Sequence, residues 1–197
     1  MEPKSYWDIA DSRVLEAIRK VPRHKFVPEN LQSVAEDDRP LPIGYGQTIS
    51  QPYIVAYMSD QLELRSHHTV LEVGTGSGYQ TAVLAELVSH VYTVECLSKL
   101  SAGAVKILTM LGYQNITAAV GDGRKGYRQA APFDRIIVTA ASEDIPQVLV
   151  EQLAVGGRML LPLGSSHGTQ YLYACRKLPT GQISTQRVLG VRFVPLV

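Results

Sequence analysis

The sequence predicts an α/β protein with a doubly wound, mostly parallel, Rossmann-like sheet, and three observations support this fold class. Short apolar runs alternate with segments of helical periodicity between residues 69 and 163. Most of these runs end in glycine or in an acidic residue, at the edge where such a sheet gathers its ligands. Two further strand-like runs follow at residues 171–177 and 186–195, with a turn at residues 179–181 between them. We therefore expect a parallel core that ends in an antiparallel tail.

The length of the chain, 197 residues, suits one sizeable core and is short for two full domains. We expect a single domain in three parts. Residues 1–65 carry accessory helices and a long loop, residues 66–163 form a ligand-binding core, and residues 164–197 add the final strands. No long apolar stripe is left without a place in this arrangement, so a monomer is expected.

Charge and residue spacing argue against several classes of function. A net charge of +1 leaves no basic footprint for nucleic acid. The five histidines do not cluster, and Cys96 and Cys175 lack metal-ligand spacing, so neither a metal site nor a disulfide framework is expected. The N-terminus has no basic-then-apolar signal, and no apolar run approaches the roughly 20 residues that span a bilayer. We expect a cytoplasmic protein without membrane contact.

The first predicted helix begins after Asp11, whose side chain can accept a hydrogen bond from the first turn. Its apolar stripe runs from Val14 to Val21, and Pro22 ends it. Residues 22–28 have prolines at both ends and a basic centre, which predicts a solvated connection with no part in chemistry.

A loop rich in proline and glycine occupies residues 36–52. A long ordered loop inside a compact domain is often functional. This loop carries two hydroxyls, Thr48 and Ser50, just before a predicted helix at residues 53–62. Two interpretations of Ser50 stay open, because its hydroxyl can cap that helix next to Pro52 or belong to a functional site.

A strand at residues 69–73 leads through a glycine turn into a helix at residues 81–88. The glycines of the turn are Gly74, Gly76 and Gly78. Glycine permits the positive φ and the close backbone approach that a turn against a ligand needs. The dinucleotide fingerprint would place its third glycine at Tyr79, one residue later than here. This spacing after the acidic Glu72 is typical of S-adenosylmethionine methyltransferases, and a tight turn without a ligand is the alternative.

Two acidic residues are predicted at the carboxyl ends of the next strands. Glu95 follows the strand at residues 91–94 and is placed to accept hydrogen bonds from the ribose hydroxyls of an adenosine ligand. Asp122 stands between two glycines after the strand at residues 116–120, where it could bind the adenine amine. The other elements are predicted as helices at residues 97–111 and 145–153, the second closed by Gly156 and Gly157, and as strands at residues 134–141 and 158–163.

Segments spread over nearly the whole chain carry a family resemblance. They are VPRHKFVP at residues 21–28, PLPIGYGQTISQP at 40–52, EVGTGSGYQTAVLA at 72–85, GDGRKGY at 121–127, APFDRIIVTAA at 131–141 and VRFVPL at 191–196. With these segments the chain resembles the protein L-isoaspartyl O-methyltransferases, which implies the class I methyltransferase fold. No Asp/Asn-Pro-Pro-Tyr/Phe motif follows the fourth predicted strand, which argues against methylation of a base amine.

The resemblance implies S-adenosyl-L-methionine as the cofactor and isoaspartyl residues of damaged proteins and peptides as substrates, whose methylation initiates repair. Ser50 matches the active-site serine of the family. The residues expected to contact the cofactor are Gln47, Thr48, Ile49, Ser50, Glu72, Gly74, Thr75, Gly76, Ser77, Gly78, Glu95, Cys96, Asp122 and Gly123. The residues expected to contact the substrate are Thr48, Ile49, Ser50, Val191, Arg192, Phe193 and Val194.

The implied substrate carries a free α-carboxylate, which has a pKa of about 3.5 and is ionised at neutral pH without a general base. We expect the Ser50 hydroxyl to orient this carboxylate by donating a hydrogen bond, and the C-terminal tail to pair with the peptide as an added strand. Three alternatives remain. They are a methyltransferase of the same fold for another carboxylate or hydroxyl, an NAD-dependent dehydrogenase, and a cofactor-binding module without catalytic activity.

Overall fold

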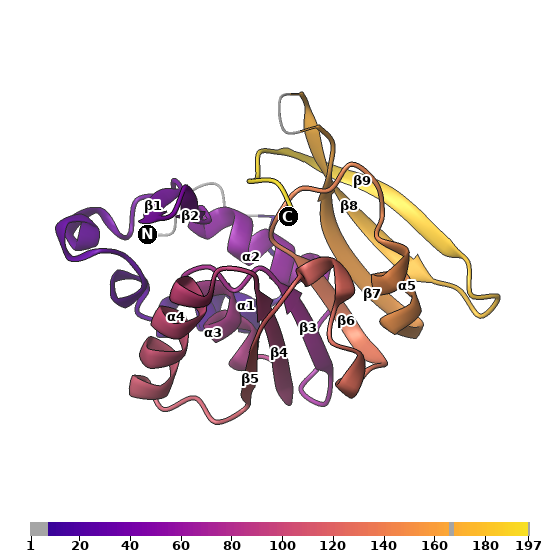
Figure 1. The fold of residues 1–197 in the computed structure, drawn as a ribbon, viewed down its shortest axis with the longest axis horizontal. Helices are drawn as coiled ribbons and strands as arrows, with labels where there is room; N and C mark the ends of the chain where they lie inside the picture. The colour runs from indigo at the N-terminus through magenta and orange to yellow at the C-terminus, as the bar shows by residue number, and fades with distance from the viewer. Residues whose placement is uncertain (1–7, 166–167, 197) are drawn as a thin grey trace.

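The centre of the computed structural model is a seven-stranded sheet in the order β5-β4-β3-β6-β7-β8-β9. In Figure 1 the strands from β5 to β7 follow one another from left to right, and β8 and β9 lie above β7. The structure describes residues 8–165 and 168–196, so most of the N-terminal stretch in which we expect no export signal lies outside the described residues. The strands of the sheet are β3 (Thr69–Val73), β4 (His90–Glu95), β5 (Ile116–Val120), β6 (Phe133–Val138), β7 (Leu153–Leu163), β8 (Gln170–Lys177) and β9 (Ile183–Val191).

The strands β5, β4, β3, β6 and β7 pair in parallel, whereas β8 and β9 are antiparallel to their neighbours. The predicted fold class, a mostly parallel sheet with an antiparallel tail, is confirmed. The chain runs outward from β3 through β4 to β5 and then returns to β6, on the other side of β3. The connections diverge at this reversal, which opens a crevice at the carboxyl ends of the strands.

Helices cover both faces of the sheet because the central strands are apolar on both sides. In β3, Val70 packs into the cluster that includes residues of α1 to α4, while Leu71 packs on the opposite face with residues of α5. The helices are α1 (Ser12–Lys20), α2 (Pro52–Gln61), α3 (Tyr79–Ala85), α4 (Ser98–Met110) and α5 (Gln147–Gln152). The cap predicted for α1 is confirmed, since Asp11 accepts a hydrogen bond from the main-chain N–H of Arg13.

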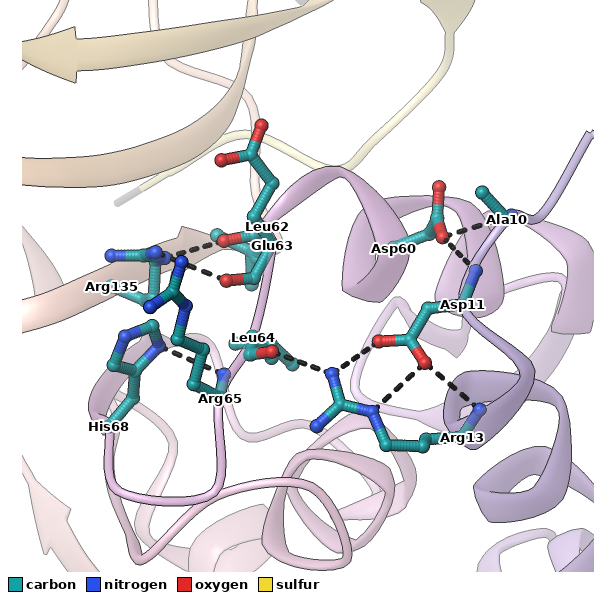
Figure 2. A network of polar contacts seen from close by, with 10 residues as sticks. All are labelled: Ala10, Asp11, Arg13, Asp60, Leu62, Glu63, Leu64, Arg65, His68 and Arg135. Carbon is teal, nitrogen blue, oxygen red and sulfur yellow. Dashed lines mark hydrogen bonds and ion pairs between the residues drawn. The ribbon is translucent and has the colours of Figure 1, made fainter.

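Polar contacts fix the end of α2 that lies away from Ser50 (Figure 2). The carboxylate of Asp60 accepts the N–H of Asp11 at 2.9 Å, which ties α2 to the start of α1. The guanidinium of Arg135, on β6, donates to the carbonyl oxygens of Leu62 at 2.5 Å and Glu63 at 3.1 Å. Because α2 is tied to both α1 and the sheet, the loop that leads into α2 ends on a helix whose position is fixed.

Three local predictions differ from the structure. The loop before α2 contains an antiparallel hairpin of β1 (Leu41–Gly44) and β2 (Gln47–Ile49). Gly156 and Gly157 lie inside β7 and do not close a helix, because residues 154–157 form a bulge where the register with β6 shifts. The last strand ends at Val191 and not at residue 195, because β8 offers no main-chain partner beyond Gln170.

Within the described ranges, no helix is long and apolar enough to cross a membrane. In the same part of the chain, no three His, Cys, Asp or Glu side chains lie close enough together to hold a metal ion.

Candidate active site

Ser50 lies on the short connection between β2 and α2, and its hydroxyl makes no hydrogen bond to any other described residue. The interpretation of Ser50 as a helix cap is wrong. Gln51 occupies the N-cap position, and the N–H of Tyr53 donates to the carboxylate of Asp38 at 2.9 Å. The carboxylate of Asp38, from earlier in the same loop, thus accepts the hydrogen bond at the start of α2, and the hydroxyl of Ser50 remains available for a ligand.

Arg23 anchors the loop that carries Ser50. It belongs to residues 22–28, for which the sequence predicts a solvated connection, but its side chain is buried. Its side chain is 1% exposed, and it donates to the carbonyl oxygens of Ala35, Arg39 and Ser50. The guanidinium also lies 5.7 Å from the ring centre of Tyr79, in the first turn of α3, a favourable distance for a cation–π contact. Arg23 therefore links the position of Ser50 to the glycine turn, although no local sequence pattern distinguishes it from an exposed arginine.

The glycine turn connects β3 to α3 and is braced by the carboxyl end of β6. Gly74 has a φ of +97°, and a Cβ placed there would collide with the hydroxyl of Thr139. That hydroxyl lies 2.7 Å from the carbonyl oxygen of Gly74 and 3.1 Å from that of Val73, to which it can donate. The close approach of β6 therefore requires glycine at this position.

We expect Gly74→Ala to lower the free energy of unfolding by about 3 kcal/mol, because it combines backbone strain with the displacement of the partly buried, hydrogen-bonded hydroxyl of Thr139. The matched control is Gly181→Ala, at a φ of +84° in the turn between β8 and β9, where a Cβ meets nothing within 4 Å. This control should cost about 1 kcal/mol, from backbone strain alone. Chemical denaturation measures both values, and equal losses would show that the contact with Thr139 carries no energy.

A cavity of about 210 Å³ lies at the carboxyl ends of β3, β4 and β6. The predicted cofactor residues that line it are Gln47, Thr48, Ile49, Ser50, Gly74, Thr75, Gly76, Ser77, Glu95, Cys96 and Gly123. Lining residues without a prediction include Tyr79, which stands where the dinucleotide fingerprint would have glycine, and Thr139, which directly follows β6. The position of Thr139 at the end of a parallel strand could have marked it as a candidate.

Glu95 is the acidic group of this cavity. The residue is only 6% exposed. One of its carboxylate oxygens accepts the N–H of Gly76 at 2.9 Å, and the other accepts the N–H of Leu97 at 3.0 Å. The thiol of Cys96 lies 3.4 Å from the same carboxylate. The pKa of this thiol is raised, mainly by burial and also by its hydrogen bond to Glu95, so Cys96 stays protonated at neutral pH. These contacts fix the orientation of the Glu95 carboxylate at the cavity wall.

Three predicted cofactor residues lie outside the cavity lining. Gly78 has a φ of +89° and faces α4, where a Cβ would approach Ala104 at 3.1 Å, and its contact with the cofactor stays a prediction. The carboxylate of Asp122 binds the guanidinium of Arg124 at 2.9 Å, and this contact holds the pKa of Asp122 below its usual range. The contact of Asp122 with an adenine amine stays a prediction.

The third of these residues, Glu72, is fully buried behind the cavity wall. One of its oxygens accepts the hydroxyl of Thr81 on α3 and the hydroxyl of Thr93 on β4. The hydroxyls of Thr93 and Thr75 lie 2.6 Å apart, which extends the network to the cavity lining. Burial raises the pKa of Glu72 to about 8, against the effect of the two hydroxyls, and the charge of Glu95 adds to the increase. Glu72 thus ties the glycine turn to the sheet, and its raised pKa favours the protonated form at neutral pH.

We expect this carboxyl group to make the protein less stable as the pH rises. Between the ordinary pKa of 4.5 and the raised value of about 8, the folded protein binds a proton that the unfolded chain releases. The stabilisation is complete below pH 4.5 and is lost as the pH passes 8, with a slope of at most about 1.4 kcal/mol per pH unit. Urea denaturation from pH 5 to pH 9 should show this decline in the wild type and a flatter curve in Glu72→Gln. Parallel curves would contradict the assignment.

A second cavity, of about 560 Å³, lies between the Ser50 loop and the end of β9. Six of the predicted substrate residues line it, namely Thr48, Ser50, Val191, Arg192, Phe193 and Val194, whereas Ile49 lines only the first cavity. Four residues line both cavities: Thr48, Ser50, Thr139 and Val194. The two spaces therefore adjoin at three hydroxyl-bearing residues and one apolar residue, so ligands bound in them would lie next to each other.

Comparison with known proteins places this geometry in one family. The family model described as Protein-L-isoaspartate(D-aspartate) O-methyltransferase matches residues 2–197. The protein-L-isoaspartate O-methyltransferase of Opitutus terrae is 51% identical over 188 residues, which are 95% of this chain and 80% of that protein. The protein of the same name from Ignicoccus hospitalis is 53% identical over 192 residues, 96% of this chain and 90% of that protein.

Among solved structures, a Plasmodium falciparum protein described as a candidate protein-L-isoaspartate O-methyltransferase was crystallised with S-adenosyl-L-homocysteine. It matches this fold with a TM-score of 0.83 at 25% sequence identity, over 96% of this chain and 92% of that one. The family model and the identity to these relatives show that the chain belongs to the protein-L-isoaspartate(D-aspartate) O-methyltransferase family.

Proposed function

We propose that this protein transfers a methyl group from S-adenosyl-L-methionine to the free α-carboxylate of isoaspartyl residues in damaged proteins, the first step of their repair. One structural observation supports this most directly: the two cavities adjoin at Thr48, Ser50, Thr139 and Val194. A donor in the first cavity and a carboxylate in the second would meet at these residues.

The lining of the first cavity suits the cofactor. Two main-chain N–H groups and the thiol of Cys96 contact the Glu95 carboxylate, which has about four acceptor positions, so capacity remains for a ribose hydroxyl. Gly74 and Gly76 offer backbone without side chains, and Leu97 and Leu196 offer apolar surface. When bound, S-adenosyl-L-methionine supplies an electrophilic methyl group on a positively charged sulfur.

The residues of this chain have to position an anion that is already ionised. We assign the Ser50 hydroxyl to donate a hydrogen bond to one carboxylate oxygen, because it has no other partner in the described part of the chain. Arg23 holds the Ser50 carbonyl oxygen at 3.0 Å and so limits the movement of the loop. The apolar residues Ile49, Val55 and Val194 line the first cavity, and electrostatic attraction is stronger beside an apolar lining than in bulk water.

The peptide chain of the substrate can pair with the strand at the edge of the sheet. β9 is the last strand of the sheet, and its final residue, Val191, lines the second cavity together with the next three residues, Arg192 to Val194. Main-chain hydrogen bonds to an edge strand bind a peptide with little dependence on its side chains. This mode of binding would allow many damaged proteins to serve as substrates.

Transfer of labelled methyl groups to an isoaspartyl peptide, beside its normal aspartyl twin, tests the proposed function. Methylation of only the isoaspartyl peptide is expected. Methylation of both peptides, or of neither while another carboxylate or hydroxyl compound is methylated, would favour the alternative methyltransferase activity. Cofactor binding without any turnover would indicate a binding module.

The monomeric state and the cytoplasmic location stay predictions. Cys96 and Cys175 are both free thiols in the structure. Analytical ultracentrifugation would measure the oligomeric state.

A further inference from the structure

The side-chain amide of Gln170, the first residue of β8, forms hydrogen bonds of the kind that a neighbouring strand forms with its main chain. The residue is 2% exposed. Its amide oxygen accepts the N–H of Phe193 at 2.6 Å, and its amide nitrogen donates to the carbonyl oxygen of Phe193 at 3.2 Å. The same nitrogen lies 3.4 Å from the carbonyl oxygen of Ser165. Paired contacts to one residue's N–H and C=O are the pattern of an antiparallel ladder. Gln170 thus continues the pairing of β9 after the strand itself has ended.

Residues 192–196, which we call the C-terminal strap, then cross from β8 to the end of β6. The backbone of Gln170 pairs with Val191, and its side chain holds Phe193 two residues later. Further along, the N–H of Ala141 donates to the carbonyl oxygen of Val194 at 2.7 Å, and the N–H of Leu196 donates to that of Ala141 at 2.8 Å. The strap therefore has two separate anchors, one at Gln170 and one at Ala141.

The two anchors serve different cavities. Phe193 lines only the second cavity, as does Gln170, whereas Leu196 lines only the first. Val194 lines both and is held by Ala141. Release of Phe193 would loosen the wall of the second cavity and leave the wall of the first in place.

We propose that Gln170 is a positioning residue that sets the affinity for the peptide substrate by anchoring the strap at Phe193. The proposal rests on the proposed function, because it takes the second cavity to be the peptide site. It assigns Gln170 no contact with the reacting atoms. Its effect should appear in the KM for the peptide and be absent from the affinity for the cofactor.

The test is Gln170→Met, which keeps the length and volume of the side chain and removes both hydrogen bonds to Phe193. We expect the KM for an isoaspartyl peptide to rise about tenfold, because two buried main-chain groups lose their partners. The kcat and the Kd for S-adenosyl-L-homocysteine should each stay within about twofold of wild type, because the Ala141 anchor is intact.

Gln152→Met is the matched control. Gln152 is also 2% exposed, and its amide accepts the N–H of Tyr127 at 2.7 Å and donates to the carbonyl oxygen of Lys125 at 2.8 Å. None of these three residues lines either cavity. The control should lose a similar amount of thermal stability and keep the wild-type KM for the peptide. An unchanged KM in Gln170→Met, or an equal rise in both variants, would overturn the proposal.

Limited trypsin digestion gives a readout that does not depend on activity. Arg192 is an exposed residue of the strap and a cleavage site for trypsin. Cleavage after Arg192 should be faster in Gln170→Met than in Gln152→Met and in the wild type. Equal rates in the three proteins would show that Gln170 does not anchor the strap. A wild-type protein without isoaspartyl methylation would refute the proposed function instead, and the digestion would still test the anchor.

Discussion

Replacement of Glu95 by alanine should weaken the binding of S-adenosyl-L-methionine by at least about a hundredfold, because each hydrogen bond from a ribose hydroxyl to a carboxylate contributes about 1.5–3 kcal/mol. Glu95 is the acidic residue that lines the first cavity, and its carboxylate is held in place by the N–H groups of Gly76 and Leu97. Its loss removes the acceptor for the ligand and a support of the glycine turn. Isothermal titration calorimetry with S-adenosyl-L-homocysteine measures the effect.

The variant Glu95→Gln is a smaller change than Glu95→Ala, because its amide can keep a hydrogen bond to only one of the N–H groups of Gly76 and Leu97. Glutamine keeps one acceptor oxygen but carries no charge, so its hydrogen bonds are weaker than those of a carboxylate. We expect a loss of about tenfold in affinity for this variant, between wild type and alanine. A suitable control is Glu86→Ala, which removes a carboxylate that binds Tyr113 and Lys20 and that does not line the first cavity. If Glu95→Ala kept its Kd within a factor of about three, the adenosine site assigned to this cavity would be wrong.

Replacement of Ser50 by alanine should lower kcat on an isoaspartyl peptide by about ten- to a hundredfold, because a misplaced carboxylate loses its alignment with the methyl donor. Ser50 lines both cavities, but its proposed hydrogen bond is to the substrate, so the affinity for the cofactor should change less than kcat. Arg23 continues to hold the main chain at this position, so the variant removes the hydroxyl and leaves the loop in place. Single-turnover methylation at saturating cofactor and peptide measures the chemical step directly.

Ser89→Ala is the control for this prediction. Its hydroxyl donates to the carbonyl oxygen of His68 at 2.7 Å. This contact lies at the amino ends of β3 and β4, whereas the first cavity lies at their carboxyl ends. This variant should keep the wild-type kcat. Full kcat in Ser50→Ala would remove the serine hydroxyl from the mechanism, and a comparable loss in both variants would show a general effect on folding.

The sequence predicts those parts of the fold that depend on short-range signals. The apolar run of β3 matches its observed bounds of Thr69–Val73, and the glycines after it form the predicted turn into α3. Glu95 follows the apolar residues of β4, and the first cavity opens beside it. Periodicity and strand ends are local properties of the chain, so the sequence alone can indicate them.

Contacts between distant segments explain what the sequence does not predict. Asp38, and not Ser50, accepts a hydrogen bond from the first turn of α2. Only the folding of the loop brings Asp38 to the start of this helix. Arg23 is buried because three carbonyl oxygens from separate positions converge on it. The sequence predicts Glu72 at the ligand, whereas its side chain points from β3 to the hydroxyls of Thr81 and Thr93. These arrangements depend on tertiary packing, which overrides local sequence signals.

A crystal structure with S-adenosyl-L-homocysteine and an isoaspartyl peptide bound together tests most directly whether the two cavities hold donor and acceptor side by side. We predict the ribose at Glu95, the sulfur facing the shared wall, and the α-carboxylate within hydrogen-bonding distance of the Ser50 hydroxyl. Cofactor bound away from Glu95, or a carboxylate far from Ser50, would contradict the account.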